Sequence, residues 1–284
     1  MKIFVGWDSR EAIACEVCLK SIKNFSPDAD ARFLKLSDPD VKECFDRPWH
    51  KEHNQYIDDQ TGTPFSTEFS FSRFIVPHLM NYQGWALFCD GDFLFRADLE
   101  RLFAYADDKY AMMCVHHNHV VKPLHPGKKA QMGERRKMDG VMQLAYERKN
   151  WSSLMLWNCG HPSNSRLSPL LAATMPGRAL HTFFWLQKEE IGEIPEEWNW
   201  LSGVSPTTPA GREINPRAQV KAVHFTEGGP WFDGYQDTPF GDEWLSVGGW
   251  KTQRLFSAEM RRHGVTAQAR NHREYDRRRK KLMA

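Results

Sequence analysis

A short apolar run that ends in two aspartates constrains this chain more than any other stretch. Residues 85–89 (WALFC) carry no charge, and Asp90, Gly91 and Asp92 follow at once. The length and aromatic content of the run favour a strand buried on both faces, which is typical of parallel sheets. In an extended chain, residues two apart point to the same side, so Asp90 and Asp92 are predicted to face one point. Gly91 allows the backbone to approach that point closely.

Two carboxylates at the end of a buried strand need a partner, because an isolated charge in a low-dielectric environment is costly. A divalent cation bound by carboxylate oxygens is the natural partner. The alternative is structural: Asp90 would cap the next helix, and Asp92 would lie in a turn. The apolar residues on both sides of the pair favour the metal. In open α/β sheets, ligands also bind at this end of the strands.

Strand and helix patterns alternate along the chain, which predicts an α/β fold with a mixed, mostly parallel central sheet flanked by helices. Besides the aspartate strand, strands are expected at 2–6, 32–36, 110–115, 154–157 and 218–225. Helices are expected at 12–23 and at 67–80, and Pro77 should kink or end the second one. Residues 38–66 are polar and contain several prolines, so we expect an irregular loop there.

Length and composition limit the possible classes of protein. The 284 residues suffice for one large α/β domain, and the formal net charge of +2 implies neither nucleic acid nor a membrane as partner. No apolar run approaches the roughly 20 residues of a membrane span, and the chain starts with a strand pattern rather than a signal peptide. The six cysteines lie mostly in apolar segments and are expected to be reduced. We therefore expect a cytoplasmic protein.

The end of the chain is basic, most densely at Arg277, Arg278, Arg279, Lys280 and Lys281. We expect residues 1–258 to form the globular domain and residues 259–284 a basic helical tail. The tail is either solvated or a weak contact with an anionic membrane surface, which would make the protein membrane-peripheral. The near-neutral overall charge speaks against nucleic acid as a partner.

Other polar residues are candidates for the same site. Arg73 is a lone cation in an apolar segment and is either salt-bridged at the surface or buried against the aspartates or a nucleotide. Ser152 opens a predicted strand. His224 ends the last predicted strand, and the glycines after it allow backbone approach to phosphates. The tract at 116–119 (HHNH) is interpreted as a polar loop, because adjacent histidines on a strand point to opposite faces.

Taken in order, these features resemble the glycogenin-like retaining glycosyltransferases (glycosyltransferase family 8-like), which have the GT-A fold. The resemblance covers about residues 1–235. It rests on four segments: residues 3–8 (IFVGWD), 71–77 (FSRFIVP), 90–92 (DGD), and His224 with 228–231 (GGPW).

The resemblance implies that Asp90, Asp92 and His224 hold Mn²⁺ or Mg²⁺ against the diphosphate of a nucleotide-sugar, which is most often UDP-linked in that family. It further implies donor contacts at Gly6, Trp7, Asp8, Arg73, Asp90, Gly91, Ser152, Gly228 and Gly229. The implied activity is hexosyl transfer from that donor to an acceptor hydroxyl with retention of the anomeric configuration. The acceptor is expected to be a carbohydrate, a lipid-linked molecule or a protein.

The chain departs from the family pattern where the transferred sugar would bind. Gly229 stands where the family usually has a lysine, and residues 186–190 (LQKEE) stand where it has Asp-Gln-Asp. Gln187, Glu189 and Glu190 are therefore the catalytic candidates. A double displacement needs a carboxylate beside the anomeric carbon, whereas same-face attack by the acceptor hydroxyl needs none and is favoured.

Two other functions remain open. A sugar nucleotidyltransferase would share the α/β class and a metal aspartate, but it would normally show a glycine-rich basic loop, and residues 6–11 (GWDSRE) are acidic and poor in glycine. A non-catalytic module that binds nucleotides or nucleic acid through the basic tail is the third possibility.

Overall fold

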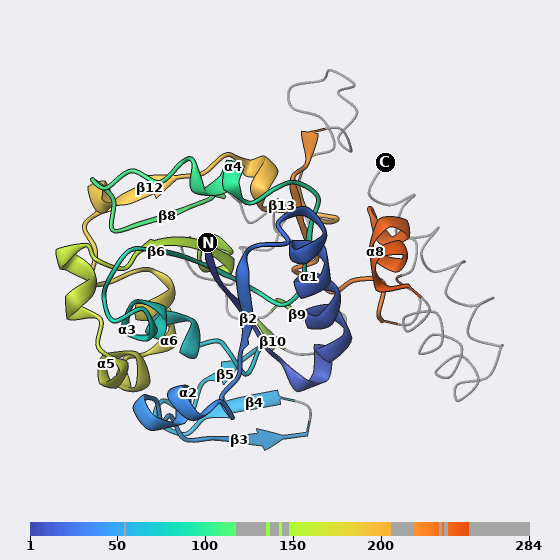
Figure 1. The fold of residues 1–284 in the computed structure, drawn as a ribbon. Coiled ribbons are helices and arrows are strands. Elements are labelled where there is room, and N and C mark those ends of the chain that lie inside the picture. The colour runs from blue at the N-terminus through green and yellow to red at the C-terminus, as the bar shows by residue number, and fades with distance from the viewer. Residues whose placement is uncertain are drawn as a thin grey trace, which may run out of the picture.

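The central sheet has one strand that runs against all the others. The structure, a computed structural model, describes residues 1–53, 55–117, 135–136, 142–143, 148–205, 219–232, 235 and 238–249. Its six-stranded sheet has the order β12-β8-β11-β6-β1-β2 (Figure 1). The strands are β1 (Lys2–Gly6), β2 (Asp30–Leu34), β6 (Trp85–Cys89), β8 (Met112–Cys114), β11 (Leu154–Asn158) and β12 (Ile191–Glu193).

Strand directions define two edges of this sheet. β1 pairs in parallel with β2 and β6, and β12 in parallel with β8, whereas β11 is antiparallel to both β6 and β8. We call the edge at which β1, β6 and β8 end, and at which β11 begins, the carboxyl edge. The other is the opposite edge. The predicted mixed, mostly parallel sheet is confirmed.

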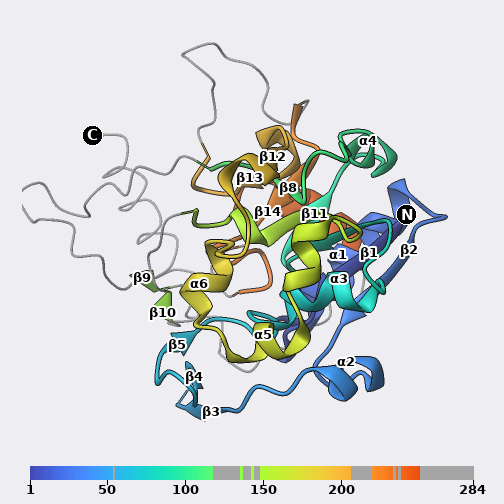
Figure 2. The same cartoon turned by 90° about the vertical axis from the view of Figure 1, so that its left-hand side faces the viewer.

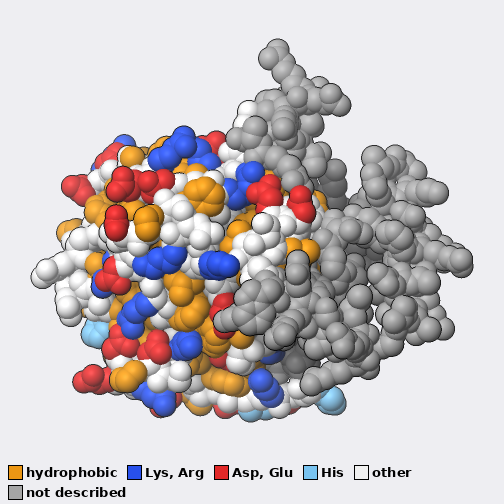
Figure 3. Space-filling model, turned by 45° about the vertical axis from the view of Figure 1, so that its right-hand side comes forward, with side chains coloured by type: hydrophobic (Ala, Val, Ile, Leu, Met, Phe, Trp, Pro, Cys, Tyr) orange, Lys and Arg blue, Asp and Glu red, His pale blue; other side chains and the backbone are white. Residues whose placement is uncertain are grey.

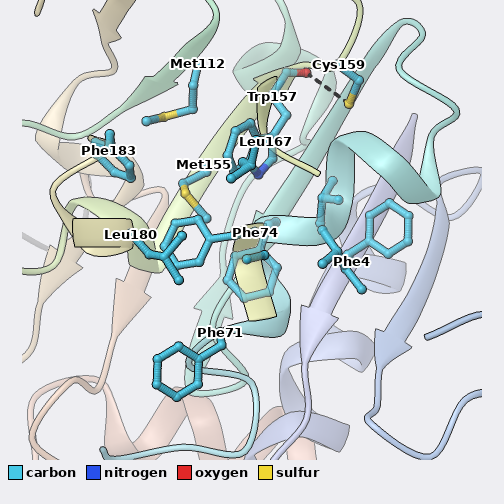
Figure 4. Close-up of a cluster of buried hydrophobic side chains, with 14 of the residues drawn as sticks. Phe4, Phe71, Phe74, Met112, Met155, Trp157, Cys159, Leu167, Leu180 and Phe183 are labelled. Carbon is cyan, nitrogen blue, oxygen red and sulfur yellow. Dashed lines mark hydrogen bonds between the residues drawn. The ribbon is translucent and has the colours of Figure 1, made fainter. Parts of the chain in front are cut away.

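Helices cover both faces of the sheet, which accounts for the continuous apolar strands. Alternate residues of β1 point to opposite faces: Ile3 and Val5 pack with Cys18 of α1, and Phe4 packs with Phe74. Helices α1 (Ala12–Phe25) and α4 (Glu100–Phe103) lie on the first face, and α3 (Val76–Leu79), α5 (Pro169–Thr174) and α6 (Gly177–His181) on the second. Figure 4 shows the core of the second face, where Phe74 and Leu180 lie against Met155 and Trp157.

A second sheet begins where the aspartate motif ends. β7 (Phe93–Phe95) pairs antiparallel with β14 (Ala222–His224), which pairs in parallel with β13 (Trp200–Leu201). Residues 90–92 therefore connect the central sheet to this small one. α8 (Gly241–Gly248) packs beside it, in a cluster of apolar side chains that includes Trp200, Trp231 and Trp244.

The loop predicted for residues 38–66 is wrong. This segment contains α2 (Pro39–Cys44) and a three-stranded antiparallel sheet of β3 (Trp49–Glu52), β4 (Gln55–Asp58) and β5 (Pro64–Phe65), at one end of the molecule in Figures 1 and 2. Packing between Tyr56 and the rings of Trp49 and Phe65, at centroid distances of 4.9 and 5.3 Å, stabilises it. Strands this short carry too few residues for a period of two to stand out.

The helix predicted at 67–80, with Pro77 kinking or ending it, is present only in part. The chain forms a 3₁₀ helix, η2 (Ser72–Ile75), and then the short α3, with Pro77 in its first turn. A continuous α-helix would need a backbone N–H at residue 77, and proline has none.

The remaining elements are short. They are η1 (Ser9–Glu11), η3 (Trp151–Ser153), η4 (Pro162–Arg166), η5 (Lys188–Glu190), η6 (Glu196–Trp198) and the strand pair β9 (Arg135–Arg136) and β10 (Met142–Gln143). Lys/Arg and Asp/Glu side chains are interspersed over the described part of the face in Figure 3. Among the described residues, no helix has the length and apolar composition needed to cross a bilayer. The predicted tail at 259–284 lies outside the described residues, so the domain division stays a prediction.

Candidate metal centre

Asp90, Asp92 and His224 meet at the carboxyl edge. The two aspartates lie in the turn between β6 and β7, and β14 places His224 opposite Phe93 of β7. One ligand atom from each of the three side chains lies within 4.8 Å of the others. Asp92 and His224 are buried, at 7% and 2% exposure. The predicted convergence of the carboxylates is present, although a turn between two sheets produces it rather than the pleat of one strand.

The turn needs a glycine at its centre. A Cβ atom on Gly91 would lie 2.4 Å from the Cys15 sulfur and 2.5 Å from the Gly6 carbonyl oxygen. Real Cβ contacts are not that short, so a larger residue would push the turn away from β1 and α1. Gly91 thus sets the position of both aspartates relative to the end of β1.

The ligand set fits Mn²⁺ or Mg²⁺. Carboxylate oxygens suit both ions, and an imidazole nitrogen favours Mn²⁺. His224 Nε2 lies 3.4 Å from Asp92 Oδ1, and its Nδ1 lies 3.0 Å from Asn199 Oδ1. The histidine ring stacks on Phe93 with centroids 4.5 Å apart and an interplanar angle of 15°. The imidazole therefore directs one nitrogen at a carboxylate and has its plane set by a neighbouring ring.

Arg73 is the buried partner of Asp90. Arg73 as a residue is 4% exposed, and its Nη1 donates to Asp90 Oδ1 at 2.7 Å and to the Ser152 carbonyl at 2.9 Å. Its guanidinium lies over the rings of Phe69 and Phe88, at 5.0 and 5.2 Å. Of the two interpretations of Arg73, the structure supports contact with the aspartates.

Two serines at the start of β11 join the parts of the site. The Ser152 hydroxyl lies 2.7 Å from His181 Nδ1, and the Ser153 carbonyl accepts from the Asp90 N–H at 2.8 Å. The Ser153 hydroxyl accepts from the Asn199 amide at 2.9 Å. Ser152, predicted to contact the donor, thus has its hydroxyl engaged with a histidine.

His181 and Asn199 were not predicted as site residues. Burial, aided by the nearby charge of Arg73, holds the pKa of His181 well below its usual value, so this histidine is neutral at pH 7. No local pattern distinguishes a single histidine at the end of a short helix. Asn199 had a weak signal, because it ends a Pro-x-x-Trp-Asn segment that is similar to one in the glycogenin-like family.

The end of β1 is more enclosed than predicted. Asp8 is 1% exposed, and its carboxylate accepts from the backbone N–H, Nε and Nη2 of Arg10 at 2.8–3.1 Å and from the Glu68 N–H at 3.3 Å. These bonds occupy the acceptor capacity of a carboxylate. A contact between Asp8 and a base or ribose would require one of them to open. Gly6 is fixed by the Phe69 ring, which a Cβ atom would approach to 2.6 Å.

Trp7 remains partly exposed at this edge, beside Lys35. The Lys35 ammonium lies 4.0 Å from the centroid of the Trp7 ring, and Phe33 packs against the same ring at 4.6 Å. After β14, Gly228 has φ +111°, and a Cβ atom on Gly229 would lie 2.3 Å from the Trp231 ring. A bond from the Thr226 hydroxyl to Asn150 Oδ1, at 3.3 Å, holds this turn near the start of β11.

The structure does not bring Gln187, Glu189 and Glu190 to the carboxylates. They immediately precede β12, which runs parallel to β8, so they lie at the opposite edge of the sheet. Glu190 accepts from the Ser163 hydroxyl and from the Gln187 N–H. Burial raises the pKa of Glu190, but these bonds and the nearby charges of His161 and Arg166 together lower it. The predicted catalytic motif is a capping box here. In this structure these three residues therefore cannot take part in a reaction at Asp90 and Asp92.

The histidine tract is described only as far as residue 117. His116 stacks on Trp151, with centroids 4.0 Å apart and an interplanar angle of 4°, and Trp151 Nε1 donates to the His117 carbonyl at 3.2 Å. Both contacts lie at the carboxyl edge, next to the serines of η3. The two described histidines thus support the wall of the site, and among the described residues neither belongs to a group of possible metal ligands.

No family model matches this sequence. A curated relative does: Protein CDI of Arabidopsis thaliana is 46% identical over 246 residues, which is 86% of this chain and 85% of that protein. The chain belongs to the family of Protein CDI. This CDI-family chain also shares its fold with solved glycosyltransferases. The sequence identities are low, so these matches show the fold and nothing further.

The bifunctional glycosyltransferase WbbM, without ligand, matches with a TM-score of 0.59 and 14% identity over 90% of this chain. The chain spans about half of WbbM, 51% of its length. The galactosyltransferase LgtC, solved with donor and acceptor sugar analogues, matches with a TM-score of 0.50 and 15% identity over 88% of this chain and 95% of LgtC. GlyE of Streptococcus pneumoniae gives 0.52 and 11% over 91% of this chain and 64% of GlyE. The CDI-family chain thus has the GT-A glycosyltransferase fold.

Proposed function

We propose that this protein is a metal-dependent glycosyltransferase that takes a sugar from a nucleotide diphosphate sugar. The observation that carries the proposal is the group of Asp90, Asp92 and His224, whose ligand atoms lie within 4.8 Å at the carboxyl edge of a GT-A sheet. Ligands of open α/β sheets bind at that edge. The glycosyltransferases with the same fold support the reaction class.

Each part of the site has a task in this proposal. Asp90, Asp92 and His224 hold Mn²⁺ or Mg²⁺, which when bound neutralises charge on the departing diphosphate. Arg73 holds Asp90 in place. The backbone at Gly228 and Gly229 lies in the turn that follows His224 and approaches the diphosphate. Trp7, which is partly exposed at the end of β1, contacts the base of the nucleotide, and UDP is the first candidate for that nucleotide.

The anomeric configuration is retained in this proposal. Asp90 and Asp92 are committed to the ion, and Glu189 and Glu190 lie at the opposite edge, so none of these carboxylates serves as a nucleophile. The acceptor oxygen instead attacks on the face that the diphosphate leaves. The bond from the anomeric carbon to the phosphate oxygen breaks, the new glycosidic bond forms, and the acceptor proton passes to the leaving phosphate oxygen.

A thermal-shift panel tests the proposal. UDP, GDP, CDP and ADP are added with and without Mn²⁺ to the wild type, to Asp92→Ala and to the control Asp98→Asn. Asp98 accepts from Ser26 and from the Glu100 N–H, outside the metal group. A ligand at 100 times its Kd stabilises a native state by about 2.7 kcal/mol.

We expect one nucleotide to raise the melting temperature in the presence of Mn²⁺, in the wild type and in Asp98→Asn but not in Asp92→Ala. The responding nucleotide names the base. If no nucleotide shifts the wild type under any condition, the metal-dependent proposal fails, and Asp90–Asp92 is a structural turn.

A further inference from the structure

Asn199 lies beside the imidazole of the candidate metal centre. It follows η6 directly and precedes β13, whose Leu201 pairs with His224 of β14. Its side chain is fully buried, at 0% exposure. Asn199 Oδ1 lies 3.0 Å from His224 Nδ1, and Asn199 Nδ2 donates to the Ser153 hydroxyl at 2.9 Å and to the Asn150 carbonyl at 3.5 Å.

The surrounding bonds fix which end of this amide faces the histidine. The Ser153 hydroxyl donates its proton to the Asn150 carbonyl at 2.6 Å, so toward Asn199 it can only accept. The Asn150 carbonyl is an acceptor as well. Both atoms therefore require the NH₂ end of the amide, which leaves the Asn199 oxygen facing His224.

An oxygen at this position determines the proton distribution on the imidazole. Asn199 Oδ1 accepts, so His224 Nδ1 must carry the hydrogen. A neutral imidazole has one N–H, so Nε2 keeps its lone pair. Nε2 lies 3.4 Å from Asp92 Oδ1, within the group of ligand atoms. An imidazole lone pair and a carboxylate oxygen at this separation can both bind one divalent cation.

We propose that Asn199 is a positioning residue that holds His224 in the Nδ1–H tautomer and thereby presents Nε2 to a divalent cation beside Asp90 and Asp92. The inference rests on the proposed function for the identity of the cation as Mn²⁺. The hydrogen-bonded chain from Ser153 through Asn199 to His224, with Phe93 stacked on the ring, prepares the ligand before the ion arrives. Partners of this kind are worth about 10- to 100-fold in metal affinity.

The first test reads the tautomer without metal. Nitrogen-15 NMR of histidine-labelled protein distinguishes the protonated ring nitrogen from the bare one, and His224→Gln assigns the signal. We expect the Nδ1–H form in the wild type and in Asn199→Asp, whose carboxylate also accepts from Nδ1. Asn199→Leu should lose this preference. An Nε2–H form in the wild type overturns the inference.

The second test measures Mn²⁺ binding, from the electron paramagnetic resonance signal of the free ion. Asn199→Leu should bind about 10- to 100-fold more weakly than the wild type, and Asn199→Asp should come close to the wild type. Asn164→Leu is the matched control. Asn164 is also 0% exposed, and it donates to the Ala111 and Asn158 carbonyls near the opposite edge. This control should keep wild-type affinity, because it loses a buried amide away from the ion.

The outcomes separate this inference from the proposed function. If the wild type binds Mn²⁺ through Asp92 and a folded Asn199→Leu binds it equally well, the inference fails and the proposed function stands. If the wild type binds no Mn²⁺, both the proposed function and the role of His224 as a metal ligand are wrong. In that case the tautomer measurement decides whether Asn199 positions the ring. Should Asn199→Leu not fold, the wild-type tautomer and Asn199→Asp still decide.

Discussion

Two buried arginine–aspartate pairs in this molecule differ in how the arginine binds the carboxylate. Arg47 and Asp58 have side chains 2% and 0% exposed and are joined by two bonds, Nε to Oδ1 at 3.0 Å and Nη2 to Oδ2 at 2.7 Å. Arg73 and Asp90 are 5% and 15% exposed, and Arg73 donates to Asp90 through Nη1 to Oδ1 at 2.7 Å. The first pair engages both carboxylate oxygens, and the second engages one.

The other contacts of the two pairs differ in the same way. Arg47 Nη1 also donates to the carbonyls of Ala172 and Met175, at 3.3 and 2.8 Å, and so joins the sheet of β3, β4 and β5 to the end of α5. Asp58 further accepts from the Thr61 hydroxyl. Asp90, by contrast, lies with Asp92 and His224 in the group that could hold an ion. A carboxylate that the protein saturates is structural, whereas one gathered with other ligand atoms suits a cation.

Breaking the first pair should have the largest effect on stability. We expect Asp58→Ala to lower the free energy of unfolding by about 3–5 kcal/mol, because it leaves the Arg47 charge buried without its partner. Urea unfolding measures this. Asp40→Ala is the control: it breaks the Arg32–Asp40 pair, whose side chains are 36% and 48% exposed, and should cost no more than about 1 kcal/mol.

The double variant Arg47→Met with Asp58→Leu sharpens this result. Removing both charges should cost less than removing one, because no uncompensated charge remains. Equal losses for Asp58→Ala and Asp40→Ala would contradict the structural role of the pair.

The second pair should respond to Mn²⁺, and the first should not. We expect Arg73→Met to destabilise the metal-free protein by about 1–3 kcal/mol, since Asp90 loses a charged hydrogen-bond partner. Mn²⁺ should then restore more stability than it adds to the wild type, because the ion replaces the arginine as the counter-charge. Thermal melts with and without Mn²⁺ measure the difference.

Arg47→Met is the matched variant for this comparison. It should lose stability that Mn²⁺ does not return, since Asp58 lies outside the candidate metal group. If Mn²⁺ restored stability equally to the two variants, or to neither of them, the distinction between the pairs would be wrong.

The smallest effect concerns pH. Burial lowers the pKa of His181, so below about pH 6.5 the unfolded chain binds a proton that the folded chain resists. Above that pH, His181 does not reduce the free energy of unfolding. Below it, the free energy of unfolding falls as the pH drops, by at most about 1.4 kcal/mol per pH unit. His181→Gln should reduce the loss of stability between pH 7.5 and 5.5, measured by urea unfolding.

The contribution of His50 to stability depends on pH in the opposite direction. Hydrogen bonds with Asp59 and Glu52 raise the pKa of this exposed histidine, so its contribution is present below about pH 6.5 and is lost as the pH rises. His50→Gln should therefore steepen the loss of stability on acidification slightly, or leave it unchanged. A steeper loss in His181→Gln would show that His181 is not held neutral by the fold.

The mixed, mostly parallel sheet, the candidate metal group and the strand end at Gly6 could be predicted from the sequence because their signals are local. Apolar runs that end in Asp90 or His224 mark strand ends, and strand ends of a parallel sheet share an edge. The structure separates Gln187, Glu189 and Glu190 from the carboxylates for a related reason: a short motif does not indicate which end of its strand it occupies. The direction of β12 placed these residues at the opposite edge.

The sequence by itself thus determined the fold class and the position of Asp90 and Asp92 at a strand end, because hydrophobic period and charge placement act between near neighbours in the chain. The resemblance to a known family added His224 as the third candidate ligand. Only the tertiary structure decided which polar groups meet across long separations. Arg73 finds Asp90, Ser152 finds His181, and Asn199 finds both Ser153 and His224. These contacts depend on strand order and on the enforced pairing of buried donors and acceptors, and no local pattern encodes either.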